Sequence, residues 1–338
     1  MSGLLTSVAA PREISRRALE QQAQVAEENE TIRVAFAKNR LRLDNIDWVV
    51  TLFLLAVHSG ALIAPFFFSW TALATCLALH WFTCSIGICL GYHRYLAHKS
   101  FKLRSPAKFM VFLAGSLSAE GAPLTWAATH RMHHQKSDRD GDPHSPLEGP
   151  WWSHVLWLFL KRNDHEQEAL YHRYAPELVN DRMLQFFERS FAYLLWGQGV
   201  ALLGIGALLG GWPMALSMLL WGMCVRMVVA YHSTWFVNSA THLWGYRNYE
   251  TRDESRNLWW VAILSYGEGW HNNHHAFPAV APAGHRWWEI DVTWWSIRVL
   301  KAVSLAYDVR DRVPQGPSAQ GSAAEYSVAT ATAARMSG

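Results

Sequence analysis

Three short stretches of the chain concentrate histidine at spacings that could hold metal ions. They are HRYLAH at 93–98, HRMHH at 130–134 and HNNHH at 271–275. On a helix, positions i, i+3 and i+4 lie on one face, so the three imidazoles of each HxxHH stretch can converge. His93 and His98 are five residues apart, which a regular helix would splay by roughly 140°, so we expect the helix to unwind between them.

A fourth stretch, NSATH, places Asn238 one helical turn before His242. The full set of candidate ligands is His93, His98, His130, His133, His134, His242, His271, His274 and His275, together with Asn238. Nine imidazoles exceed the about four to six ligands of one ion, so the count predicts two ions. Imidazole suits Fe, Zn, Cu and Ni, so the ligand type leaves the metal open.

Other histidines lack ligand spacing. We interpret His58 and His80, inside apolar runs, as helix residues whose hydrogen bonds are satisfied within the protein. The remainder are interpreted as packing or surface residues: His154, His165, His172, His232 and His285. The segment DRDGDPH holds Asp138, Asp140, Asp142 and His144. These side chains could be further ligands, but we expect them to orient ligand histidines by hydrogen bonds, with Asp142 and His144 as the candidates.

The elements that must position these side chains are long apolar segments. Two pairs, 47–68 with 70–91 and 190–210 with 213–237, approach the ~20 residues that cross a ~30 Å hydrocarbon core. Lys and Arg flank the outer ends of each pair and are absent from both turns, which predicts hairpins that open toward the cytoplasm. The fold class is therefore predicted to be an all-α integral membrane protein with four transmembrane helices in two hairpins and both termini cytoplasmic.

The polar segments 92–189 and 238–313 are predicted to form a cytoplasmic helical cap that carries the histidines. Cap and spans together make one domain over 45–313. Residues 1–44 are predicted to be a polar N-terminal cytoplasmic segment without a secretory signal. The small, polar residues 314–338 are predicted to be a disordered tail.

Composition excludes several classes of protein. A formal net charge of only +3 over 338 residues argues against a nucleic-acid partner. The four cysteines lie in apolar runs without CxxC spacing, which argues against a disulfide framework. A histidine-rich metal transporter remains an alternative, although it would place ionisable residues through the membrane midplane rather than at one end of the spans.

Taken together, the histidine stretches resemble those of the membrane fatty acid desaturase family, in its acyl-CoA Δ9 (stearoyl-CoA) branch. Neighbouring segments extend the resemblance: GYHR at 91–94, DPHSP at 142–146, TWFVNSATHLWGYR at 234–247 and GEGWHNNHHAFP at 267–278. The resemblance implies an oxidoreductase with a non-haem di-iron centre that uses O2 to introduce a cis double bond into a long-chain acyl thioester. A related membrane di-iron hydroxylase or alkane monooxygenase is the nearest alternative.

The resemblance also implies how the ligands divide. One iron would take His93, His98, His134 and His275, with Asn238 acting through a water. The other would take His130, His133, His242, His271 and His274. Electrons would come from a separate carrier of ferredoxin, rubredoxin, flavoprotein or cytochrome type, because we recognise no attached electron-transfer domain in the sequence. The expected location is the bacterial cytoplasmic (inner) membrane.

An acyl chain needs an apolar channel beside the metals. The resemblance suggests that Trp126 and Trp235 line this channel near its bend, and we expect the bulk of Leu77 to limit its depth.

Arg226 lies inside the fourth apolar run, where a charge costs ~2.5–3.5 kcal/mol on insertion scales, so a role or a partner is expected for it.

Overall fold

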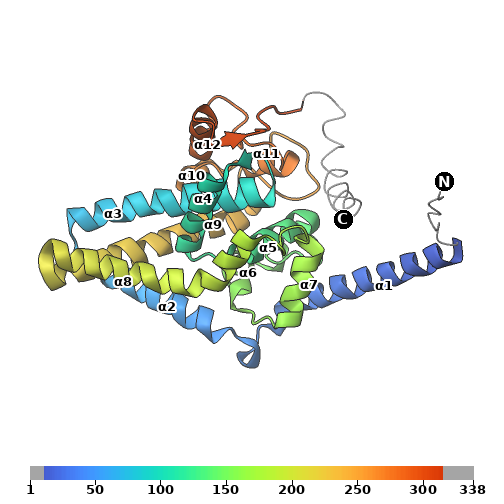
Figure 1. The fold of residues 1–338 in the computed structure, drawn as a ribbon, viewed down its shortest axis with the longest axis horizontal. Helices are drawn as coiled ribbons and strands as arrows, with labels where there is room; N and C mark the ends of the chain where they lie inside the picture. Colours follow the sequence, from blue (N-terminus) through green and yellow to red (C-terminus); the bar gives the residue numbers. More distant parts are fainter. Residues whose placement is uncertain (1–10, 315–338) are drawn as a thin grey trace, which may run out of the picture.

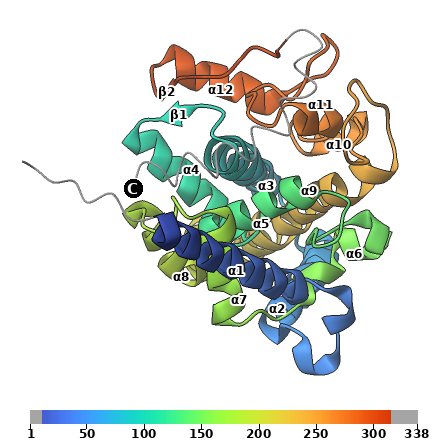
Figure 2. The same cartoon turned by 90° about the vertical axis from the view of Figure 1, so that its right-hand side faces the viewer.

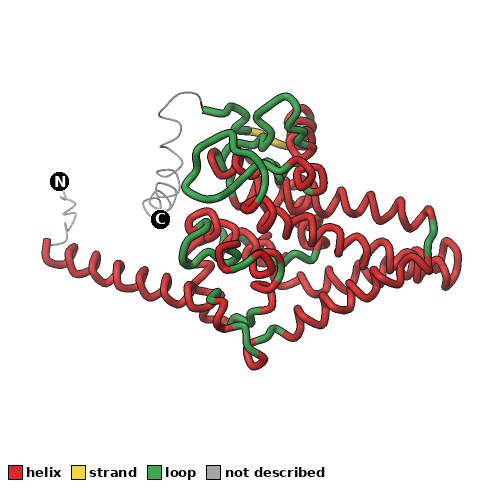
Figure 3. Tube along the Cα trace, turned by 180° about the vertical axis from the view of Figure 1, so that it is seen from behind, coloured by secondary structure: helices red, strands yellow, loops and turns green. Residues whose placement is uncertain are grey.

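The computed structural model describes residues 11–314, so the predicted tail at 314–338 lies, but for its first residue, outside the described residues. Long apolar helices extend to one side of the molecule, and shorter helices and loops gather on the other (Figure 1). Figure 3 shows that the connecting loops concentrate in this second part, which we call the cap.

Helix α1 (Pro11–Ala35) extends away from the body of the molecule (Figure 1). Its described side chains are largely exposed until the last turn, where Ile32 and Ala35 are buried against α5 (Pro123–Lys136) and α7 (Asp164–Tyr174). Two short helices, η1 (Lys38–Arg40) and η2 (Leu43–Asn45), then lead into the first apolar segment. The polar N-terminal region is therefore anchored to the cap at its C-terminal end.

The first apolar hairpin follows local capping rules. Asp47 accepts hydrogen bonds from Val49 N and Val50 N and so caps α2 (Trp48–Ile63). After η3 (Ala64–Phe67), the Ser69 hydroxyl accepts from Ala72 N and begins α3 (Trp70–His80), which continues as η4 (Trp81–Ala97). Both arms, at Trp48–Phe67 and Trp70–Ala97, are long and apolar enough to cross a membrane.

Helix η4 has π-helical geometry, in which each amide bonds the carbonyl five residues earlier. At its end, His98 N donates to His93 O over 3.1 Å. The predicted unwinding between these histidines is therefore wrong, because the helix widens instead. The wider turn brings His98 above His93, with ring centroids 4.8 Å apart.

The second apolar segment, Arg182–Leu243, holds 62 residues and would be about 93 Å long as one straight helix. It folds back on itself at Gly210 and Gly211, which have non-helical dihedral angles within α8 (Arg182–Leu219). The chain returns through η7 (Leu220–Val225) and α9 (Arg226–Leu243) (Figure 1). The turn falls where the apolar runs predict it, between 210 and 213.

Glycines allow the helices to approach closely. A Cβ on Gly206 would lie 2.6 Å from Ala215 Cα across the second hairpin. A Cβ on Gly87 of η4 would lie 2.4 Å from Gly115 N of α4 (Ser105–Ser118). The backbones of η4 and α4 are thus in direct contact, which holds the end of η4, with His93 and the C-cap residue His98, against the cap.

The cap surrounds the open end of both hairpins (Figure 2). Its remaining elements are η5 (Pro146–Glu148), α6 (Pro150–His154), η6 (Leu156–Phe159), α10 (Trp259–Leu264), α11 (His271–Ala276) and α12 (Val292–Ala302). Strands β1 (Lys102–Leu103) and β2 (Ala306–Tyr307) pair antiparallel, with Lys102 opposite Tyr307. This pair ties the segment after η4 to the C-terminal end of the described chain.

Candidate metal centre

All nine candidate histidines converge where the hairpins meet the cap. They come from η4, its C-cap residue His98, α5, α9 and α11. Their nitrogens form two groups, and within each group the atoms that could bind a metal lie within 4.8 Å of one another. The first group is His93, His98, His130, His134 and His274, and the second is His133, His242, His271 and His275.

This grouping differs from the division that the family resemblance implies. His130 and His274, expected with the second ion, lie in the first group, and His275 lies in the second. The distances between the nitrogens thus group these three residues differently from the expected division. On α11, His271 and His275 are one helical turn apart and face one group, while His274 is turned toward the other. Asn238 lies one turn before His242 on α9 and lines the same cavity as His130 of the first group.

The spacing of the nitrogens fits bound metal ions. His274 Nε2 lies 3.0 Å from both His93 Nε2 and His134 Nε2, and His271 Nε2 lies 3.1 Å from His242 Nε2. Two nitrogens bound at about 2.1 Å and at right angles would be separated by about 3.0 Å. One imidazole Nε2 carries at most one hydrogen, so His274 cannot donate to both neighbours, whereas a shared ion would satisfy all three.

The electrostatics of the first group favour neutral ligands. Burial, helped by the neighbouring imidazoles, lowers the pKa of His98, His130, His134 and His274. Their lone pairs are therefore free to bind a cation at neutral pH. In the second group, His133 Nε2 and His275 Nε2 are buried without a hydrogen-bond partner among residues 11–314, which an ion between them would supply.

Four carboxylates contact ligand histidines at Nδ1, the ring nitrogen that does not face the metal site. Through their Nδ1 atoms, His242 is hydrogen-bonded to Asp138 at 2.8 Å, His133 to Asp142 at 3.0 Å and His275 to Asp253 at 2.8 Å. His93 Nδ1 lies 2.8 Å from Glu268 Oε2. A carboxylate at Nδ1 keeps the hydrogen there and leaves Nε2 as the metal-binding atom.

The pKa directions agree with ionised carboxylates. Burial raises the pKa of Asp253, but the His275 imidazole outweighs burial and leaves that pKa well below its ordinary value. The pKa of Asp142 is lowered in the same way by His133, and that of Glu268 by Arg94 and His93. Arg94 Nη2 lies 3.0 Å from Glu268 Oε1, so this carboxylate is also held by a buried cation.

The sequence predicted only some of the side chains that contact the ligand histidines. The structure places Asp142 and His144 beside His133, and the rings of His144 and His133 stack with centroids 4.3 Å apart. Asp140, from the same segment, is 82% exposed and lies 3.9 Å from Arg33. Asp253 and Glu268 were missed. Glu268, three residues before His271 in GEGWH, gives a weak signal, whereas nothing near Asp253 marks it.

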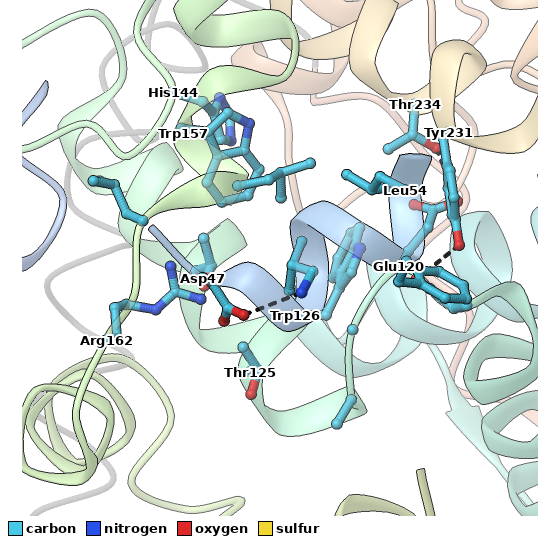
Figure 4. Close-up of a pocket in the computed structure, with 18 of the residues that line it drawn as sticks. Asp47, Leu54, Glu120, Thr125, Trp126, His144, Trp157, Arg162, Tyr231 and Thr234 are labelled. Carbon is cyan, nitrogen blue, oxygen red and sulfur yellow. Dashed lines mark hydrogen bonds between the residues drawn. The ribbon is translucent and has the colours of Figure 1, made fainter. Parts of the chain in front are cut away.

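A cavity of about 470 Å³ lies beside the first group (Figure 4). Its apolar walls come from α2, η6 and α8 and include Val50, Phe53, Leu54, Leu158, Phe191 and Leu195. His130, His144 and Asn238 line it on the side of the metal ligands. Such a size and composition suit a ligand that is mainly apolar.

Both predicted tryptophans line this cavity. Trp126 stacks on His130 with ring centroids 4.9 Å apart, and Trp235 lies on α9. Leu77, by contrast, is 62% exposed and does not line the cavity, so its predicted role in limiting depth is wrong. It faces outward because the opposite side of α3, with Ala72 and Cys76, is buried in the bundle.

Two polar ends bound the cavity. Asp47 and Arg162 lie at one end and Glu120 at the other, in Figure 4. Burial raises the pKa of Glu120 to about 8, although the Thr234 hydroxyl donates to it over 3.2 Å. Arg226, for which the sequence offered no partner, lies near this end and donates hydrogen bonds to Gly222 O, Thr83 Oγ1, Leu117 O and Gln198 Oε1.

Comparison with known proteins identifies the family. The family described as fatty acid desaturase matches residues 68–300. The sn-2 palmitoyl-lipid 9-desaturase of Nostoc sp. (strain 36) is 45% identical over 290 residues, or 83% of this chain and 96% of that protein. The sn-1 stearoyl-lipid 9-desaturase of Anabaena variabilis is 44% identical, over 78% of this chain and 94% of that protein. The acyl-CoA C20 Delta5-desaturase of Anemone leveillei is 40% identical, over 77% and 80%. A match that contains every one of the nine histidines places this protein in the fatty acid desaturase family.

Proposed function

We propose that the protein is a membrane desaturase that introduces a cis double bond at the Δ9 position of a long saturated acyl chain carried by a membrane lipid. The observation that carries the proposal is the pair of imidazole groups beside an apolar cavity lined by Trp126 and Trp235. The lipid carrier replaces the acyl-CoA expected from the sequence, because two of the relatives above act, by their names, on acyl-lipids.

The two imidazole groups would hold two iron ions. When bound, such a pair supplies the oxidising power to remove two hydrogens from an unactivated methylene pair, using O2 and two external electrons. Asp142 and Asp253 keep the Nδ1 hydrogens of His133 and His275 in place, so that each Nε2 stays available. Asn238 would reach an ion through a water molecule.

The cavity residues position the acyl chain. Its apolar walls exclude water from the reacting carbons, and Trp126, stacked on His130, holds the chain against the first group. The protonated carboxyl of Glu120 gives the far end a hydrogen-bond donor rather than a charge. Chain length and double-bond position are then decided by how far the chain can pass these side chains.

We further propose that Arg182–Leu243 crosses the bilayer twice, which gives four spans. The reversal at Gly210 and Gly211 supports this arrangement, since each arm approaches the length of a bilayer core. Both termini and the metal centre are on the cytoplasmic side in this topology. The membrane is the bacterial cytoplasmic membrane, and electrons arrive from a separate protein carrier.

Expression of the chain in a desaturase-deficient host tests the function. The expected result is a new Δ9 double bond in membrane lipids, located by gas chromatography and mass spectrometry after regiospecific hydrolysis of the lipids. His133→Ala should abolish the product, while His165→Ala, on the exposed face of α7, should not. Hydroxylated acyl chains would favour the monooxygenase alternative, and product in the acyl-CoA pool before the lipids would refute the lipid carrier.

A further inference from the structure

Three histidines outside the metal centre form a hydrogen-bonded chain. His58 on α2 and His232 on α9 approach within 3.3 Å through their Nε2 atoms. His232 Nδ1 then lies 3.0 Å from His154 Nε2, at the end of α6. These residues are far apart in the sequence, which predicts a helix residue with satisfied hydrogen bonds for His58 and packing or surface roles for His154 and His232. The structure instead links three elements of the protein through them.

The ends of the chain determine its direction. His58 Nδ1 lies 2.7 Å from Leu54 O, and a carbonyl can only accept, so His58 donates there and accepts at Nε2. His232 must then donate from Nε2 and accept at Nδ1, and His154 must donate from Nε2. At the far end, the Ser239 hydroxyl lies 3.0 Å from His154 Nδ1 and 2.8 Å from Trp235 O, and its single hydrogen can be donated to only one of these two acceptors.

This geometry argues against two other roles. His232 uses both ring nitrogens on different neighbours, so the three imidazoles do not point at one shared ion. A proton relay would need an outlet, but the chain ends on Leu54 O, a carbonyl that cannot pass a proton onward. What remains is a connection that fixes the relative positions of α2, α6 and α9.

The three rings surround the indole of Trp235. The rings of His232 and His154 meet it edge-on, with centroids 5.0 and 5.6 Å away. The His58 ring is nearly parallel to the indole at 6.4 Å, and Tyr231 stacks on it at 5.5 Å. Since Trp235 is 5% exposed and lines the cavity, its position determines part of the cavity wall.

We propose that His58, His232 and His154 are positioning residues that hold Trp235 in place and thereby set the chain-length and double-bond specificity of the enzyme. This inference rests on the function proposed above. Loss of the hydrogen bonds between these histidines frees the indole to change rotamer. The cavity then accepts acyl chains of other lengths or in another register. The expected effect is on the distribution of products more than on the presence of activity.

The central residue gives the sharpest test. His232→Leu removes both of its hydrogen bonds, whereas His232→Gln offers an amide N–H to His58 and an amide oxygen to His154, as the direction of the chain requires. In cells fed equal amounts of 16- and 18-carbon acyl chains, we expect His232→Leu to change the product ratio by about threefold to tenfold. His232→Gln should restore a ratio close to that of the wild type.

The matched control is His80→Leu. His80 also lies in an apolar helix and makes one side-chain hydrogen bond, 2.6 Å to the Tyr266 hydroxyl, but it does not line the cavity. Its product ratio should equal that of the wild type. If His232→Leu does not fold, as judged by membrane yield and thermal unfolding, His58→Leu, at the chain end, decides the question.

An unchanged ratio in the Leu variants would overturn the inference. So would an equal change in His232→Gln and His232→Leu, because the hydrogen bonds would then not be the cause. A wild-type protein that makes no double bond at all would instead refute the proposed function. The two failures are therefore distinguishable in one experiment.

Discussion

Replacement of Asp253 by asparagine should weaken metal binding although it leaves the ligand set intact. Asp253 Oδ2 accepts from His275 Nδ1 over 2.8 Å, and its Oδ1 accepts from Ser255 N over 3.1 Å. The asparagine oxygen can keep the bond to Ser255, which turns its NH2 group toward His275. The imidazole must then accept at Nδ1 and carry its hydrogen on Nε2, where it blocks the lone pair that faces the second group.

The loss should be large because the pair is shielded from water. The Asp253 side chain is only 11% exposed and that of His275 1%. Substitutions of this kind reduce metal affinity by about 10- to 100-fold, or about 1.4 to 2.7 kcal/mol, and the tautomer argument places Asp253→Asn toward the upper end.

The assay is iron retained by purified protein in detergent, measured by mass spectrometry across a series of chelator concentrations. Asp140→Asn is the control, since that carboxylate is 82% exposed and contacts no ligand histidine. Its curve should follow the wild type, while that of Asp253→Asn shifts to lower chelator concentration. If Asp253→Asn folds, by circular dichroism, and retains iron as the wild type does, the role assigned to the carboxylates is wrong.

Three further predictions concern stability, measured by thermal unfolding in detergent. The pKa of Glu120 is raised to about 8, from about 4.3 in an unfolded chain. The wild type should therefore lose stability relative to Glu120→Gln as pH rises from about 4.5 to 8. A stability difference between the two proteins that stays constant with pH would contradict the burial of this carboxyl. Gly87→Ala should destabilise the protein by about 1–3 kcal/mol, since its Cβ would lie 2.4 Å from Gly115 N. Gly204→Ala should be neutral or better, because its Cβ would meet no neighbouring atom of residues 11–314 within 4 Å. Gly211→Ala should destabilise the protein by about 1–3 kcal/mol through backbone strain, because φ is +68° and ψ is −161° there and an added Cβ would meet nothing within 4 Å in the described part of the chain. An unchanged unfolding midpoint would refute the turn.

Local patterns in the sequence predicted much of the candidate site. The i, i+3, i+4 spacing brings the histidines of each HxxHH stretch to one region, because a helix repeats every 3.6 residues whatever surrounds it. The same local rules predicted the turn near Gly210 and the long apolar helices. The family followed from these motifs as well, and the comparisons confirm it.

Predictions failed where the outcome depends on how one helix is rotated against another. Apolar residues are needed on every side of a membrane helix, so hydrophobicity could not reveal that Leu77 faces outward. The helix after His93 widened rather than unwound, because its packing on α4 keeps it helical up to His98.

Residue types and their spacing thus determined that this chain groups nine imidazoles in four short motifs outside or at the ends of its long apolar helices, because periodicity and hydrophobic length are local properties. Only the tertiary structure decided which group each imidazole joins, which carboxylates stand behind them and that His58, His232 and His154 meet around Trp235. These pairings join residues up to 181 positions apart, as His93 and His274 are, and they depend on the rotation and crossing of several packed helices at once. The sequence pattern of one helix does not determine how another helix is oriented against it.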